Sequence, residues 1–520
     1  MLALNETGIQ ALTNATGMQI LGFQLHTRLR VEKGMDRKAF LAELKNICGE
    51  RGVLHEPADL IVYEYDGSVD GAVDTERPMA AVLPTSTEQV SAVVRLAWQH
   101  GVPVVARGAG TGLSGGAVAR GGGIIIALTR MDRMLRVDPV NRTALVEPGV
   151  INLELSQSVH GDGMFFAPDP SSQKACTIGG NVAENSGGPH CLKYGVTTNH
   201  ILGLEVVLPD GTVTWIDAHG PGVGGLDLAA ILVGSEGMLG ITTKILVRLM
   251  PNPEAVHVHL AAFGTMDDAA ACVTNIIGAG ILPASLEMMD QLTIEAVEPA
   301  YHAGYPMDAA AVLLVEVDGT RADVDETSDH IARIARESGA TSFRSADSKA
   351  QQDLLWKGRK MALAAMGRLA PNYYLHDTVV PRTRLTETLR AVSDISHEFR
   401  LSIANVFHAG DGNLHPLMLF DRRQPGNVER ILEASHELIK TCVSMGGTLS
   451  GEHGIGSEKQ GYMELIYTGE DLAAMAGIKL AFDPREMFNP EKVLPKGYMC
   501  GEVRALHNQA MAQKHGIHPM

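Results

Sequence analysis

The chain has 520 residues, which is too long for one hydrophobic core, so we expect two or three domains. Apolar residues make up 45% of it, enough for each domain to bury a core, and the formal net charge is −17. This charge argues against nucleic acid or an anionic membrane as a partner, and an anionic substrate would need local positive charge in order to bind.

Six cysteines are scattered along the chain, at positions 48, 176, 191, 272, 442 and 500, and no two of them share a C-x-x-C spacing. This pattern argues against a zinc ribbon, an iron–sulfur cluster or a redox dithiol within the chain. Scattered cysteines in a large acidic protein are typical of the reducing cytoplasm. No apolar run is long enough to span a membrane. Residues 1–35 lack the pattern of a signal peptide and are predicted to be a mobile tail.

The first ordered element is predicted to be a helix, because Ala39, Phe40, Leu44 and Ile47 recur at helical spacing. Strand and helix signals then follow up to Pro251-Asn-Pro253, a turn that predicts a domain boundary. The strands expected in this part are 80–83, 102–106, 123–128, 135–137, 143–147, 202–209, 212–217 and 244–249, and the other helices are 85–97 and 151–160.

Two short signals in this part predict local geometry. Thr85-x-x-Glu88 predicts a capping box at the start of the second helix. Asp210-Gly211, between two apolar runs, predicts a tight β-hairpin.

The glycine-rich stretch Arg107–Gly116 directly follows a predicted buried strand. Glycine allows positive φ and has no Cβ, so successive amide N–H groups can turn toward one anion, most simply a pyrophosphate. Gly110-x-Gly112-x-x-Gly115 also fits the dinucleotide fingerprint, with Asp132 at about the right distance for a ribose. That fingerprint requires a helix directly after the glycines, whereas the chain here runs into a second strand. An ordinary flexible turn is the remaining alternative.

Two further clusters of small residues occur between apolar strands. Pro168–Ser172 leads into the glycine-rich stretch Cys176–Gly188, and Gly234–Gly240 forms a third turn. Three such loops suit one long ligand that lies across several strand ends.

The second part of the chain is predicted to form an antiparallel sheet with helices on one face. Alternating Val256, Val258 and Leu260 indicate a half-buried first strand. The other expected strands are 311–317, 341–344, 403–407 and 414–420, and the expected helices are 267–279, 323–338 and 383–399.

The three small-residue loops together resemble the FAD-binding domain of the vanillyl-alcohol oxidase (PCMH-type) flavoprotein family. Residues 36–500 resemble its glycolate oxidase catalytic-subunit and D-lactate dehydrogenase group. The resemblance implies an α+β fold, with a PCMH-type FAD-binding domain over 36–252 and an FAD-linked oxidase C-terminal domain over 253–482. It also implies that 483–500 returns to the first domain, with Glu491 where the family has glycine, and that 501–520 is a tail.

The resemblance implies that FAD is the cofactor. It assigns cofactor binding to Arg107, Gly108, Ala109, Gly110, Thr111, Gly112, Leu113, Ser114, Pro168, Asp169, Ser172, Thr177, Gly179, Gly180, Asn181, Ser186, Gly187, Gly188, Glu236, Gly240 and Ile241. Relatives with covalently bound flavin carry histidine where Thr111 stands, so we expect FAD to be bound without a covalent link.

Two histidines, His408 and His415, flank the turn of the sequence HAGDGNLH, and Glu452-His453 lies in a second glycine-rich turn. Two imidazoles and a carboxylate suit zinc, manganese or iron(II). This histidine spacing is not a general metal motif, and hydrogen-bonded structural histidines are the alternative. The resemblance implies that His408, His415 and Glu452 bind a divalent metal and that His453 is the catalytic base.

Trp356–Lys360 is a basic stretch in an acidic chain, and Arg359 could hold a carboxylate with its planar fork, although a solvated helix face is the alternative. The resemblance places the substrate-carboxylate arginine at Arg359. Leu363 and Leu375 stand where 2-hydroxyglutarate enzymes use polar residues, which favours a small substrate such as glycolate or D-lactate. Asn413, Tyr373 and Tyr374 are candidate pocket residues, with core packing the alternative for the tyrosines.

The resemblance thus implies FAD-dependent oxidation of a small 2-hydroxy acid to the 2-oxo acid by hydride transfer to flavin N5. Electrons would pass to flavin-domain and iron–sulfur partner subunits and a quinone, or to a soluble carrier. The protein would be cytoplasmic, or peripherally attached to the inner membrane through its partners. A D-2-hydroxyglutarate-type dehydrogenase, a non-redox flavoenzyme such as an alkyl-glycerone-phosphate synthase, and a nicotinamide-dependent dehydrogenase are the alternatives.

Overall fold

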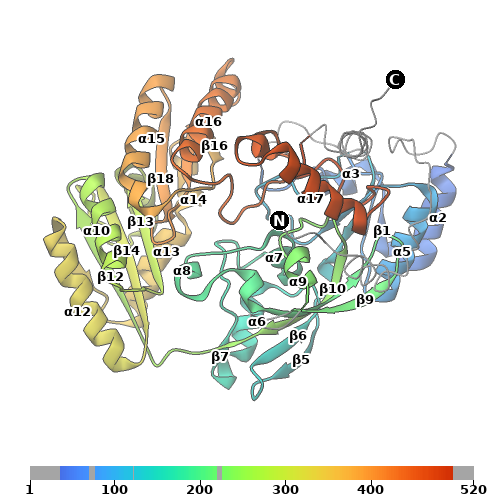
Figure 1. Cartoon of the computed structure of the whole chain (residues 1–520), viewed down its shortest axis with the longest axis horizontal. Helices are drawn as coiled ribbons and strands as arrows, with labels where there is room; N and C mark the ends of the chain where they lie inside the picture. Colours follow the sequence, from blue (N-terminus) through green and yellow to red (C-terminus); the bar gives the residue numbers. More distant parts are fainter. Residues whose placement is uncertain (1–34, 69–76, 121, 219–224, 496–520) are drawn as a thin grey trace, which may run out of the picture.

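The computed structural model describes residues 35–68, 77–120, 122–218 and 225–495. The predicted tails, 1–35 and 501–520, lie outside the described residues except for residue 35. Figure 1 shows two parts side by side, the N-terminal part on the right and the larger sheet of the second part on the left.

The first sheet of the N-terminal part has the strand order β1-β2-β4-β3, with β2, β4 and β3 parallel and β1 antiparallel to β2. Its strands are β1 (Val53–Leu54), β2 (Ala80–Val82), β3 (Val104–Arg107) and β4 (Ile124–Ala127). Helices α2 (Arg37–Cys48) and α5 (Thr87–His100) pack on one face, and α3 (Pro57–Leu60) packs on the other.

The N-cap of helix α5 lies one residue later than predicted. Ser86 is its N-cap, with Oγ accepting from the backbone N–H of Gln89 at 3.4 Å, so the predicted Thr85–Glu88 capping box is wrong. The side chain of Gln89 instead accepts from the backbone N–H of Thr85 at 2.7 Å. Serine and threonine are both good N-caps, so their adjacency leaves the register ambiguous in the sequence.

The second sheet of the N-terminal part is antiparallel and has the order β5-β6-β10-β8-β9. Its strands are β5 (Met134–Asp138), β6 (Thr143–Val146), β8 (Ile201–Val207), β9 (Val213–Asp217) and β10 (Ile241–Arg248). The other helices of this part are α6 (Asn152–Val159), α7 (Ile178–Glu184), α8 (Cys191–Tyr194) and α9 (Leu228–Leu232), and a small sheet joins β7 (Met164–Phe165) to β11 (Met250–Pro251). The predicted hairpin is confirmed: β8 pairs with β9, and Gly211 has φ +83°.

The second part is built on a nine-stranded sheet in which every pairing is antiparallel. Its strands are β12 (Ala255–Phe263), β13 (Ser285–Asp290), β14 (Ala311–Gly319), β15 (Ala340–Ser345), β16 (Asn372–Leu375), β17 (Thr378–Val379), β18 (Ser402–His408), β19 (Asn413–Leu414) and β20 (Pro416–Phe420). The α+β class expected from the sequence is confirmed.

Helices cover both faces of this sheet, so the prediction of helices on one face is wrong. One face carries α10 (Met266–Gly278), α12 (Arg321–Glu337), α15 (Leu385–Phe399) and α16 (Asn427–Ser444). The other carries α11 (Gln291–Tyr301), α13 (Lys349–Lys360) and α14 (Ala362–Ala365). Strand β12 is therefore buried on both sides, because Ala261 and Phe263 face one layer while Val258, Leu260 and Ala262 face the other. A run with little alternation is what two-sided burial produces.

The last described segment packs against the N-terminal part of the chain. Helix α17 (Gly469–Phe482) lies with the elements of that part in Figure 1, and Lys479 Nζ donates to Met238 O at 2.6 Å. Beyond it, the Val104 N–H donates to Met487 O and the Asn489 N–H donates to Val104 O, both at 2.8 Å.

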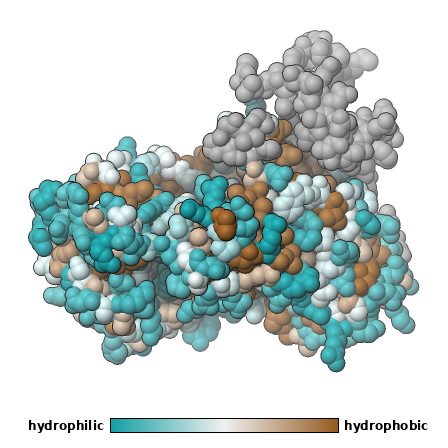
Figure 2. Space-filling model, turned by 90° about the horizontal axis from the view of Figure 1, so that it is seen from below, coloured by the Kyte–Doolittle hydropathy of each residue, from teal (hydrophilic) through white to brown (hydrophobic). Residues whose placement is uncertain are grey.

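Hydrophilic residues cover much of the face shown in Figure 2, and its apolar residues lie in separate areas between them. Among the described residues, no helix is both long and apolar enough to cross a membrane.

Candidate active site

A cavity of about 470 Å³ lies between the glycine loops of the N-terminal part and the sheet of the second part. One wall is made by Arg107–Leu113 and by residues of the second and third small-residue loops. The other wall carries Arg359, His415, Glu452 and His453. The three loops and the proposed chemical residues, which are far apart in sequence, therefore face one space of ordinary ligand-site size.

The first glycine loop follows the carboxyl end of β3 without a helix. No described residue between Arg107 and β4 is helical, which removes the nicotinamide-type fingerprint. Gly110 has φ +74°, and a Cβ there would clash with the guanidinium of Arg107. That guanidinium donates to Val62 O at 3.2 Å and to Ala117 O at 3.4 Å, so its side chain braces the loop.

Most of the predicted cofactor-binding residues line this cavity. Those that do are Arg107, Gly108, Ala109, Gly110, Thr111, Gly112, Leu113, Ser172, Thr177, Gly180, Asn181, Ser186, Gly187 and Glu236. Gly179, Gly240 and Ile241 line an adjoining space of about 50 Å³.

Four predicted cofactor residues, Ser114, Pro168, Asp169 and Gly188, are not among the residues lining either space. Ser114 is fully buried, and its carbonyl accepts the Ser457 N–H at 3.0 Å. The Pro168 carbonyl accepts from Asn152, and Asp169 accepts from His190 at 2.9 Å. A Cβ on Gly188 would lie 2.6 Å from the Asp169 backbone, so that glycine serves loop packing.

The three predicted metal ligands come together. His408 Nε2 lies 3.1 Å and His415 Nε2 3.2 Å from the same oxygen, Glu452 Oε1. The other ring nitrogens are already engaged: His408 Nδ1 lies 2.8 Å from Glu287 Oε1, and His415 Nδ1 lies 3.1 Å from His376 O. Two Nε2 atoms that face one carboxylate, with each Nδ1 held behind, form the usual arrangement of histidine metal ligands.

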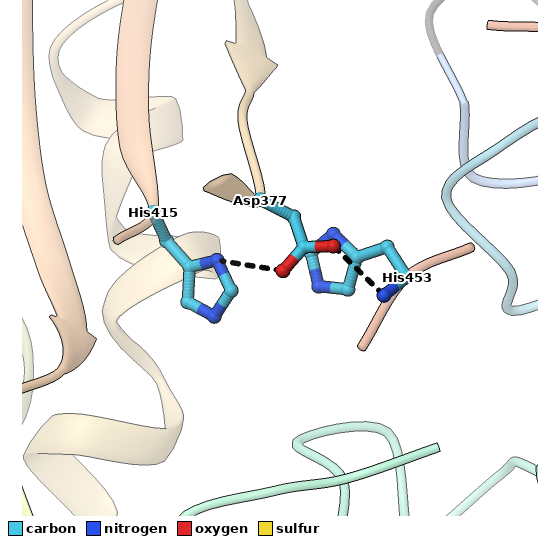
Figure 3. Close-up of side chains that lie close together, drawn as sticks. All are labelled: Asp377, His415 and His453. Atoms are coloured by element: carbon cyan, nitrogen blue, oxygen red, sulfur yellow. Dashed lines mark hydrogen bonds and ion pairs between the residues drawn. The ribbon is translucent and has the colours of Figure 1, made fainter. Parts of the chain in front are cut away.

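Asp377, which the sequence did not single out, holds the turn that carries Glu452 and His453. Its carboxylate accepts from Ser450 Oγ at 2.6 Å and from the backbone N–H groups of Gly451, Glu452 and His453 at 2.9–3.3 Å. Figure 3 shows it between His415 and His453. Asp377, His415 and His453 also lie close enough to hold an ion. The many donors to Asp377 make it a structural carboxylate instead, since its oxygens are already occupied.

Glu287 is the second residue that sequence reasoning missed. It lies on β13 with its side chain fully buried and directly opposite His408 of β18. Its Oε2 accepts from Arg359 Nε at 2.7 Å. Arg359 Nη2 lies 2.5 Å from the same oxygen, so Glu287 Oε2 faces two nitrogens of the guanidinium. A single glutamate in an apolar strand gave no motif that could have revealed it.

The candidate substrate-binding residues of the second part do not all face the cavity. Tyr373 lines the cavity, whereas its neighbour Tyr374 points into the core, as alternation along β16 requires. Asn413 does not line the cavity, and its side chain packs against Gly451. Leu363, Ala364, Leu375 and Val406 also face the cavity.

The sequence matches known proteins in both parts. Residues 78–217 match the family model described as "FAD binding domain", and residues 252–493 match "FAD linked oxidases, C-terminal domain". The chain is 44% identical to glycolate oxidase subunit GlcD of Escherichia coli (strain K12), over 91% of this chain and 94% of that protein. The chain belongs to the FAD-linked oxidases. This FAD-linked oxidase is also 35% identical to D-lactate dehydrogenase of Archaeoglobus fulgidus, over 80% of this chain and 91% of that protein.

The fold of this FAD-linked oxidase is also that of p-cresol methylhydroxylase, whose structure with substrate bound covers 88% of this chain with a TM-score of 0.75 at 18% identity. The alignment spans 97% of that chain, so the PCMH-type fold is confirmed.

The cavity of this FAD-linked oxidase fits a long cofactor. Glycines stand where a side chain would intrude: a Cβ on Gly187 would lie 2.7 Å from Glu452 Oε2 and 2.7 Å from Cys191 Sγ. A Cβ on Gly112 would meet only Glu184 Oε1, at 3.7 Å, so this part of the loop borders nearly open space. The small-residue loops can therefore approach a cofactor with their backbones.

The pKa values in the histidine–carboxylate cluster reflect burial and close opposite charges. Burial alone would raise the pKa of Glu452, but His408 and His415 hold it well below its ordinary value. Burial is likewise outweighed at Glu287, whose pKa falls to about 2 beside His408 and Arg359. Burial lowers the pKa of His453 to about 4, so its imidazole is neutral at neutral pH.

Proposed function

We propose that this FAD-linked oxidase oxidises a small 2-hydroxy acid, glycolate or D-lactate, to the 2-oxo acid. One observation carries the proposal: the glycine-lined cavity for FAD opens directly onto a buried arginine, onto His415 and Glu452 of the histidine–carboxylate cluster, and onto a neutral third histidine. The names of its relatives, a glycolate oxidase subunit and a D-lactate dehydrogenase, support the same substrate class.

Arg359 binds the substrate carboxylate. Its side chain is only 4% exposed, yet it lines the cavity. A guanidinium at a cavity wall binds a carboxylate through charge-assisted hydrogen bonds. Lys360 adds a second positive charge to the same wall, which offsets the acidic net charge of the protein locally.

The rest of this wall is apolar, which favours a substrate with a single carboxylate. Leu363, Ala364, Leu375 and Val406 offer no polar partner to a second carboxylate, and Lys360, the other cation of this wall, already lies 3.7 Å from Asp169. Burying an unpaired charge is costly, so a diacid such as 2-hydroxyglutarate is the disfavoured alternative.

His408, His415 and Glu452 bind a divalent zinc, manganese or iron ion. Their converging nitrogen and oxygen atoms, all within 4.8 Å of one another, supply the donors that these ions prefer. When bound, the ion supplies Lewis-acid chemistry that lowers the pKa of a coordinated hydroxyl. Histidine ligands bind as neutral imidazoles, so acid should weaken metal binding.

His453 takes the hydroxyl proton of the substrate. Its ring stacks on that of His415 at a centroid distance of 5.0 Å, and its backbone is fixed by Asp377. A neutral imidazole at the cavity wall can act as a general base. FAD, when bound, supplies the two-electron chemistry by accepting hydride at N5, while the protein supplies position and charge.

The flavin is bound without a covalent link, because Thr111 offers no imidazole for one and lines the cavity in its place. Acid precipitation should release all of the yellow colour into the supernatant. Colour retained in the protein pellet would contradict this.

Electrons leave the reduced site through partner subunits that carry a flavin domain and iron–sulfur clusters, and then reach a quinone. The relative named as a glycolate oxidase subunit supports a multi-subunit enzyme. The six cysteines of this chain show no cluster-binding spacing, so the clusters would belong to the partners. The protein is cytoplasmic and meets the inner membrane only through these partners, with a soluble carrier as the alternative acceptor.

Anaerobic bleaching of the flavin tests the proposal. Glycolate or D-lactate should reduce the bound FAD, whereas D-2-hydroxyglutarate should reduce it slowly. Rapid bleaching by D-2-hydroxyglutarate alone would reassign the substrate. No bleaching by any 2-hydroxy acid would favour a non-redox flavoenzyme.

A further inference from the structure

Glu287 is a buried carboxylate that joins the two ends of the candidate active site. It is 0% exposed and stands in the middle of β13, within a sheet covered on both faces. A carboxylate in such a place is costly unless both oxygens are paired. Here Oε1 faces His408 Nδ1 at 2.8 Å and Ser285 Oγ at 3.2 Å, while Oε2 faces Arg359.

On the side of His408, Glu287 determines which ring nitrogen of that histidine carries the proton and which keeps its lone pair. A carboxylate can only accept hydrogen bonds, so His408 Nδ1 must carry the proton that it donates to Oε1. In the neutral ring the lone pair is then on Nε2, which faces Glu452 Oε1 at 3.1 Å. This tautomer is the one that a metal bound at Nε2 requires.

Toward Arg359, Glu287 supplies an opposing charge. Among the described residues, Arg359 forms its ion pair with Glu287, and both side chains are buried. Nε at 2.7 Å and Nη2 at 2.5 Å both lie against Glu287 Oε2, so the pair fixes the plane of the guanidinium from behind while Arg359 lines the cavity. It also cancels part of the positive charge that an incoming carboxylate would meet.

We propose that Glu287 is a positioning residue with opposite effects at its two ends: it strengthens metal binding at His408 and weakens anion binding at Arg359. The metal half rests on the proposed function. The anion half rests on the proposed function only in placing the carboxylate site at Arg359, and it depends neither on the metal nor on turnover.

Glu287→Gln tests both halves, since glutamine has nearly the same shape without the charge. Its amide group can also present N–H to His408 Nδ1, which would select the wrong tautomer. Zinc affinity, measured by chelator competition, should fall roughly 10–100-fold, the usual range for a residue behind a histidine ligand. In chelator-treated protein, propionate titrated against the flavin spectrum should bind severalfold more tightly than to the wild type. Flavin content should not change.

Asp290→Asn is the matched control. Asp290 is a buried carboxylate on the same strand, and it accepts from the backbone N–H and side chain of Asn405 on β18 at 2.8 and 2.9 Å. It contacts neither Arg359 nor a proposed ligand. Its replacement should leave zinc and propionate affinity unchanged, whereas a general weakening of the β13–β18 pair would lower both.

Glu287→Asp is a second variant, for the case in which Glu287→Gln loses its flavin. Aspartate keeps the charge but is one methylene shorter, so zinc affinity should still fall while propionate affinity should not rise. Unchanged zinc affinity in both variants, or weaker propionate binding in the glutamine variant, would overturn the inference. A wild type that binds no zinc and is not bleached would instead refute the proposed function, and the propionate comparison would still decide the anion half.

Discussion

The glycine-loop wall and the histidine–carboxylate wall of the cavity are built in different ways. The first consists of backbone held by small residues, as at Gly110 and Gly187, where a Cβ would clash. The second consists of buried charged side chains that satisfy one another, from Arg359 through Glu287 and His408 to Glu452. The comparison indicates that cofactor retention and chemistry are separable, because side-chain substitutions on one wall leave the backbone of the other in place.

His415→Ala should give the largest effect on the second wall. It removes one of three proposed metal ligands, so the variant should lose its metal and most of its turnover while remaining yellow. Elemental analysis beside flavin absorbance measures both. Stoichiometric metal in the variant would mean that His408 and His415 are hydrogen-bonding residues instead.

His453→Ala should lower kcat by roughly 10²–10⁴-fold, the usual effect of losing a general base. Metal and flavin should both remain, because a base is not a ligand. His330→Ala, an exposed histidine on α12, is the control and should have wild-type kinetics. If the His453 variant turned over at the wild-type rate, another group would have to take the proton.

Arg359→Lys should lower kcat/KM by about 10–100-fold, with KM raised, because lysine keeps the charge but loses the planar fork. Flavin content should be normal. Lys357→Ala, two residues earlier on α13 and exposed, should change neither constant. Steady-state kinetics with glycolate and D-lactate would measure the difference, and a normal KM would remove Arg359 from the substrate site.

A substitution at the contact between the two parts of the chain should give the smallest effect, a pH-dependent change in the free energy of unfolding. His190 bonds to Asp169 at 2.9 Å and to Glu316 at 3.0 Å, and Lys360 lies 3.7 Å from Asp169. Burial would lower the pKa of His190, but the two carboxylates raise it well above 6.5. The stabilisation by the charged ring is therefore fully present below pH 6.5 and is lost as pH rises through the raised pKa.

His190→Gln should accordingly lower the free energy of unfolding by about 2 kcal/mol near pH 6, and by less in alkali. Buried His259 provides the opposite case, because burial lowers its pKa to about 4, so its contribution is lost as pH falls below 6.5. Denaturant unfolding of His190→Gln and His259→Gln across this range measures both trends. Parallel pH profiles would show that His190 is not charged in the folded protein.

The two walls also differ in how much of each could be predicted from the sequence. The glycine loops are local signals, and most of the residues assigned to them line the cavity. The residues that support the second wall are not local: Glu287 is the lone glutamate in the run SLEMMD, and Asp377 meets its turn 73 residues further along the chain. The helices on both sheet faces were missed because strand β12 was interpreted as alternating, although residues of both parities are buried. Partners brought together only by tertiary packing leave no periodic pattern.

Anaerobic reduction of the bound flavin by a panel of 2-hydroxy acids tests the central claim most directly. The purified protein should be yellow, and glycolate or D-lactate should bleach it in a metal-dependent reaction that chelator treatment suppresses and zinc or manganese restores. Flavin that stays oxidised with every 2-hydroxy acid, in metal-replete protein, would contradict the account.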